Sequence, residues 1–69
     1  MEEVWTKPFS VDGQDFEATF VRRPFREGLE VHCMVSGVTV RVAEFGFGET
    51  ALLEKLRARV IELLRFPGT

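Results

Sequence analysis

The chain contains one histidine and one cysteine, His32 and Cys33, the residue types from which nucleophilic and metal sites are often built. They are adjacent within Leu29–Val35, where apolar and polar residues alternate as in a half-buried strand. Neighbouring side chains of a strand point to opposite faces, so this pair cannot form a Cys–His dyad or share a metal ion. We therefore expect Cys33 in the core, His32 on the surface, and no catalytic residue, metal or other cofactor.

Two further segments carry residue types that can bind a ligand. The glycines of segment 46–50 could present backbone amides to an anion at the start of a helix, but Glu49 within that segment would repel an anion. Asp12 and Asp15 flank Gly13, where aspartate normally supports the geometry of a turn. The sequence has neither a phosphate-binding loop with its lysine nor a nucleophile-elbow motif. We predict that the chain is not an enzyme.

The densest group of charges is in segment 22–26, where Arg22, Arg23 and Arg26 surround Phe25. Arginine beside an aromatic ring can hold a phosphate and stack on a base, which favours binding of single-stranded nucleic acid. The competing interpretation is a solvated loop whose arginines pair with nearby carboxylates, namely Glu17, Glu27 or Glu30. The formal net charge of -2 favours the solvated loop, so weak nucleic-acid binding is the alternative function.

The elements that position these residues begin with a predicted hairpin. Residues 4–11 and 15–23 have the alternation of strands, and the Asp-Gly dipeptide at 12–13 favours a two-residue type I′ turn. The predicted cross-strand pairs match like with like: Phe9 with Phe16, Trp5 with Phe20, and Thr6 with Thr19. Lys7 and Pro8 are residues that protect a free strand edge, so the first strand is expected at the edge of the sheet.

A second hairpin joins Leu29–Val35 to residues 38–45 through the Ser-Gly dipeptide at 36–37. Counting across this turn opposes apolar residues on one face: Val35 with Val38, Cys33 with Val40, and Val31 with Val42. A slip of one residue would put these side chains in water, so the register is well determined. The last strand is rich in valine, lacks proline and forms the second edge of the sheet.

The rest of the chain predicts a helix over Glu49–Arg65. Its leucines and valine recur at spacings of three and four residues, which is typical of one buried helix face. The predicted fold is α+β, a four-stranded antiparallel meander with one C-terminal helix packed on one face, in the order ββββα. One helix can cover only one face of the sheet, so the other face is left open.

Composition limits the wider interpretation. With 69 residues, 45% hydrophobic and 29% charged, the chain is expected to form a single small domain, 1–69. A lone cysteine cannot form an internal disulfide, and the acidic start lacks the pattern of a signal peptide. No apolar run approaches the length needed to cross a bilayer. We expect a cytoplasmic protein with no membrane partner.

The open face mixes apolar and charged side chains and lies beside the exposed last strand. These features predict a small interaction module that binds through this face or through the edge of the last strand. The expected partner is a second copy of the chain, forming a homodimer, or another protein. The residues predicted to contact the partner are Val21, His32, Met34, Arg41 and Phe45.

In topology, the order ββββα with a C-terminal amphipathic helix resembles the single-stranded-DNA-binding transcriptional coactivators. Those proteins are dimeric and bind along their sheets, so the resemblance implies a dimer with a functional sheet face. It rests on topology and not on shared motif residues. The sequence also lacks the basic sheet face that such binding needs, because Lys7, Arg23 and Arg41 are offset by Glu17 and Glu30.

Overall fold

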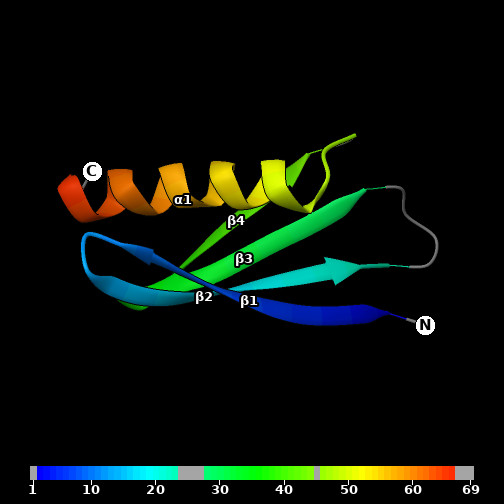
Figure 1. Ribbon diagram of the computed structural model, residues 1–69, viewed down its shortest axis with the longest axis horizontal. Coiled ribbons are helices and arrows are strands. Elements are labelled where there is room, and N and C mark those ends of the chain that lie inside the picture. Colours follow the sequence, from blue (N-terminus) through cyan, green and yellow to red (C-terminus); the bar gives the residue numbers. More distant parts are fainter. Residues whose placement is uncertain (1, 24–27, 45, 67–69) are drawn as a thin grey trace.

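The computed structural model describes residues 2–23, 28–44 and 46–66. Four strands form one antiparallel sheet in the order β1-β2-β3-β4, and a single helix packs against it (Figure 1). The elements follow one another along the chain as β1 (Glu3–Val11), β2 (Gln14–Arg22), β3 (Leu29–Val35), β4 (Val38–Glu44) and α1 (Glu49–Arg65). The predicted ββββα fold is confirmed.

Both hairpins close through two-residue turns that need left-handed backbone at each central position. Asp12 and Gly13 have φ of 49° and 81°, and Ser36 and Gly37 have φ of 50° and 81°. This is the pattern of a type I′ turn, whose twist matches that of the flanking strands. The cross-strand partners are those expected from the sequence, including Trp5 with Phe20 in the first hairpin and Cys33 with Val40 in the second.

The core lies between α1 and the sheet face that carries the aromatic and valine side chains. Phe20, Val31, Leu52, Leu56 and Val60 are each fully buried there. The Trp5 ring stacks on Phe20 with centroids 5.6 Å apart and planes inclined by 10°. Stacked aromatic pairs and aliphatic side chains thus fill the space under one helix, which supplies most of the stabilisation available to so short a chain.

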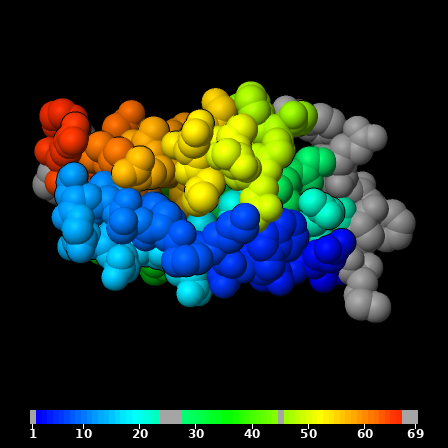
Figure 2. All heavy atoms as spheres, in the orientation of Figure 1, coloured from blue at the N-terminus to red at the C-terminus, as the bar shows by residue number. Residues whose placement is uncertain are grey.

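Three polar contacts join α1 to β1, the strand farthest from β4 in the sheet. The indole Nε1–H of Trp5 donates to Glu49 Oε1 at 3.0 Å, and Lys7 Nζ lies 3.0 Å from the same oxygen. Farther along, Arg57 Nε donates to the backbone oxygen of Ser10 at 3.3 Å. In Figure 2 the atoms of β1 (blue) and α1 (yellow to red) lie against each other on the visible face. The helix is therefore held at β1 as well as over β3 and β4.

The sheet face away from α1, called the open face below, is not covered by any helix or strand of the described residues. β1 and β4 are the two edges of the sheet, as expected. In the described part of the chain, no helix combines the length and the apolar character needed to cross a membrane.

Candidate functional site

The fold keeps His32 and Cys33 apart, and the described residues form no cluster that could hold a metal ion. No group of three or more histidine, cysteine or carboxylate side chains within them could hold a metal ion. Cys33 is buried under α1, and burial raises the pKa of its thiol, which keeps the thiol protonated. His32, which directly precedes Cys33, lies on the open face opposite Arg41. The two side chains are on opposite faces of β3, as the alternation predicts.

The open face carries an ion-pair network centred on Glu30. Its Oε1 accepts hydrogen bonds from Arg23 Nη1 at 2.6 Å and from Arg41 Nη2 at 3.0 Å. Arg23 also donates from Nε to Glu2 Oε2 at 3.1 Å. Burial acts to raise the pKa of Glu30, but the hydrogen bonds and positive charges of the two arginines outweigh it and hold that pKa below its ordinary value. The network ties β3 to β4 and to the end of β2 and neutralises its own charges.

Replacing Glu30 with glutamine is expected to weaken the pH dependence of stability in acid. A lowered folded-state pKa means that Glu30 contributes stability above its ordinary value of 4.5, and that this is lost as pH falls through the lowered value. Because both arginines are largely exposed, we expect the variant to lose about 0.5–1 kcal/mol at pH 7. Urea unfolding between pH 3 and 7 would measure this pH dependence. The free energy of unfolding of the wild type should fall more on acidification than that of the variant.

Glu17→Gln is the matched control, because Glu17 is exposed on the same face and has no ion-pair partner among the described residues. Its acid profile should follow the wild type. Identical profiles for the wild type and for Glu30→Gln would contradict the role assigned to the network.

Four of the residues predicted to contact a partner lie together on the open face. His32 and Arg41 are directly opposed between β3 and β4, and Met34, which is 60% exposed, lies two positions from His32. Val21 lies on the same face but is only 7% exposed, because β2 is an interior strand and Val4 and Glu30 flank this residue on both sides. Val21 therefore offers little contact area. The fifth residue, Phe45, lies outside the described residues.

The arginines proposed for nucleic-acid binding are divided between the two faces of the sheet. Arg22 lies on the helix side, with its guanidinium carbon 5.3 Å from the centroid of the Trp5 ring and a nitrogen 3.9 Å from Glu3. Arg23 lies on the open face in the Glu30 network. Phe25 and Arg26 lie outside the described residues. The two described arginines thus do not form one basic surface, and carboxylates already offset their charges.

The two sheet edges differ in the backbone groups that they present. The two residues that flank a two-residue turn are hydrogen-bonded to each other. Along each strand, residues that bond to the partner strand then alternate with residues whose backbone N–H and C=O groups point outward. In β1 the outward-facing positions therefore include Pro8 and Ser10. Pro8 has no N–H to offer, and the carbonyl of Ser10 is occupied by Arg57. The β1 edge is consequently closed to another strand at its turn end, although Val4 and Thr6 keep outward-facing backbone groups.

In β4 the same alternation directs the backbone groups of Thr39, Arg41 and Ala43 away from β3. Each of these residues has an N–H, and within residues 2–23, 28–44 and 46–66 no hydrogen-bond partner occupies their outward-facing backbone groups. An edge with free donors and acceptors is a template for pairing with another strand. The β4 edge is therefore open where the β1 edge is closed.

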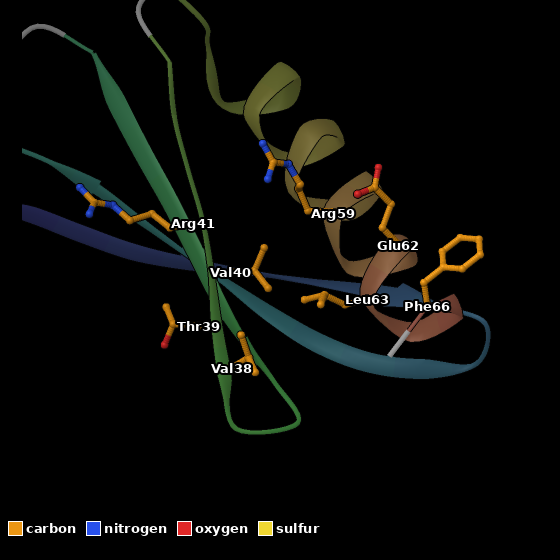
Figure 3. Close-up of a pocket in the computed structure, with 8 residues that line it drawn as sticks. All are labelled: Val38, Thr39, Val40, Arg41, Arg59, Glu62, Leu63 and Phe66. Carbon is orange, nitrogen blue, oxygen red and sulfur yellow. The ribbon is translucent and has the colours of Figure 1, made fainter. Parts of the chain in front are cut away.

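An open groove of about 700 Å³ runs along this free edge between β4 and the C-terminal half of α1 (Figure 3). In the figure Val40 and Leu63 point toward each other across it, while Thr39 and Arg41 point away from the helix. Val38, on the same side as Val40, is 52% exposed. We call this the edge groove, and its lining residues are Val38, Thr39, Val40, Arg41, Arg59, Glu62, Leu63 and Phe66.

The sequence identified β4 as an exposed edge but did not reveal the groove. Of the predicted contact residues that the structure describes, Arg41 alone lines it, and the helix residues Arg59 and Glu62 were not singled out. One feature of the sequence could have indicated the groove. Val38 is an apolar residue directly after the turn, on the face that α1 covers, and it lies at the end of β4 that only the last residues of a helix beginning at Glu49 can reach. The distance between strand and helix there depends on how far the sheet twists.

Comparison of the chain with protein-family models, with curated proteins and with solved structures finds no match. The candidate site is therefore defined by geometry alone, as a free β4 edge beside an amphipathic groove.

Proposed function

We propose that this chain is a small, non-catalytic interaction module that binds a partner by adding a strand to the β4 edge. The observation that carries the proposal is the contrast between the two edges. Pro8 and the Arg57 contact to Ser10 close the turn end of β1, whereas Thr39, Arg41 and Ala43 of β4 keep free backbone groups along that whole strand. A sheet that protects one edge and leaves the other open directs pairing to a single place.

The edge groove supports the side-chain part of this recognition. A strand added beside β4 places alternate side chains toward Val38, Val40 and Leu63, and the others toward Thr39 and Arg41. The preferred partner is therefore an extended segment that alternates apolar residues with polar or acidic ones. The edge is favoured over the open face because the Glu30 network already pairs Arg23 and Arg41, the two arginines of that face.

The free, buried thiol of Cys33 is typical of proteins kept in a reducing compartment, which supports a cytoplasmic location for this function.

Strand addition is expected to slow hydrogen exchange at the outward-facing amides of β4. The probe is a capped peptide of alternating valine and glutamate, titrated into the protein while amide exchange is followed by NMR. Thr39→Pro removes one outward-facing donor without touching the bonds between β3 and β4, and should weaken binding of the peptide by about 5-fold or more, the value of one lost hydrogen bond. The amides of Arg41 and Ala43 should become protected in the wild type and not in this variant.

Val4→Pro is the matched control, since it removes an outward-facing donor from the β1 edge. Binding should be unchanged in this variant. Protection that appears on β1, or binding insensitive to Thr39→Pro, would contradict the proposal. Oligonucleotide binding at low salt that Arg23→Glu abolishes would instead support the nucleic-acid alternative.

A further inference from the structure

We infer that the strand received by the β4 edge is the β4 strand of a second copy of this chain, paired antiparallel and centred on Val40. The inference rests on the proposed function, because it names the partner of the same edge. A two-fold axis perpendicular to the sheet would join the two sheets into one of eight strands, with both helices on the same side.

The side chains of β4 select this register. Directly opposed residues of an antiparallel pair lie on the same face of the sheet. A two-fold axis between two β4 strands must therefore lie at a point where one residue is opposed to its own copy, and each register is named below by that residue. Centred on Val40, the axis opposes Val38 to Val42 and Val40 to itself on the helix side. On the open face it opposes Thr39 to Arg41, so no like charges meet.

The neighbouring registers are less complementary. An axis through Arg41 brings two guanidinium groups into direct opposition, which is destabilising. An axis through Val42 opposes Glu44 to Val40 on the apolar side. An axis through Thr39 leaves Val42 opposite Ser36 of the turn. Only the Val40 register opposes valine to valine along the whole apolar face.

The backbone is compatible with the same register. Thr39 and Arg41 both direct their N–H and C=O groups to the free edge, so in the Val40 register they form hydrogen-bonded pairs on either side of the axis. Val40 then occupies the close, non-hydrogen-bonded position, where its side chain meets its own copy. Each free group at the centre of the edge gains a partner.

The two helices would lie on the same side of the joined sheet, facing each other across the two-fold axis. Where α1 lies over both β3 and β4, its axis is about half a strand spacing inside β4, and the two-fold axis is about half a spacing outside; toward its C-terminal end the edge groove separates α1 from β4. The two helix axes would lie about two strand spacings apart, about 10 Å, within the normal range for packed helices. The facing ridge carries Arg59 and Glu62, one cation and one anion, so the seam has no net charge.

Sedimentation equilibrium of charge variants at Thr39 tests both the dimer and its register. Thr39→Glu sets a carboxylate opposite Arg41 in two symmetric pairs, and Thr39→Lys sets a cation there. We expect the dimer dissociation constant to fall by about 2- to 30-fold for Thr39→Glu and to rise by a similar factor for Thr39→Lys, the range typical of two cross-strand pairs. Thr39 is exposed in the single chain, so both variants should fold.

The outcomes separate this inference from the proposed function. A wild type that sediments as a monomer at every accessible concentration overturns the homodimer, and peptide-induced protection of the β4 amides would then still uphold strand addition. A dimer whose dissociation constant is the same in the wild type and in both Thr39 variants overturns the register. A dimer whose protected amides lie outside β4 overturns the inference and the proposed function together.

Discussion

Replacement of Phe20 by alanine is expected to lower the free energy of unfolding by about 3–5 kcal/mol, the usual cost of deleting a buried aromatic ring. Phe20 is fully buried, stacks on Trp5 at 5.6 Å and lies opposite Val31 in the next strand. Its removal leaves a cavity between the sheet and α1 that the neighbouring strands are too constrained to fill. Urea unfolding followed by far-UV circular dichroism measures the loss.

Phe16→Ala is the matched control, because Phe16 lies on the same strand and face but is only partly buried, stacked on Phe9 at 5.5 Å. Its loss should be clearly smaller. A chain of this length has a total stability of only about 3–10 kcal/mol, so Phe20→Ala is expected to be partly unfolded even without urea. Phe20→Leu keeps most of the volume and should stay folded with an intermediate loss. Equal losses for Phe16→Ala and Phe20→Ala would contradict this account of the core.

Leu56→Ala is expected to cost about 2–5 kcal/mol. Leu56 is fully buried at the middle of α1, between Leu52 and Val60 on the stripe that faces the sheet. Alanine is the better helix former, so the helix itself gains slightly and the loss comes from packing alone. Thermal unfolding of the variant should show a melting temperature lowered by about 8–40 °C, as this loss implies for a domain of this size.

Leu53→Ala makes the same chemical change on the same helix, next to Leu52 but at the margin of the buried stripe, where the side chain is only partly buried. It should lower the melting temperature by less than half as much. A similar drop in both variants would mean that α1 is stabilised mainly within itself and not by the sheet beneath it.

The fold followed from the sequence because each of its signals is local and the signals agree. The Asp-Gly and Ser-Gly dipeptides determine where the chain reverses, and the reversal then sets which residues pair. Alternation on the strands assigns each apolar side chain to one or the other face of the sheet, and a 3.6-residue repeat over Glu49–Arg65 defines the buried side of the helix. Agreement between turn chemistry and periodicity is what makes a sequence of this kind specify one topology.

The candidate site was predicted only in part, because face and exposure are different properties. Alternation placed Val21 on the open face, but its burial depends on what the two adjacent strands put beside it. Likewise, Arg23 and Arg41 were known to share a face with Glu30, but only the folded chain brings both guanidinium groups to one carboxylate oxygen. Such contacts join residues from different strands, and single-strand patterns contain no information about their distances.

The sequence by itself determined the order of the elements, the register of both hairpins and the existence of two sheet edges. It also indicated how β1 is protected, since Pro8 and Lys7 stand in its middle. The tertiary structure decided which edge stays available, because α1 sends Arg57 to the Ser10 carbonyl on one side and leaves a groove beside Val38 and Val40 on the other. The direction in which a helix crosses a twisted sheet depends on packing over the whole core, and this geometry leaves a groove beside one exposed edge strand.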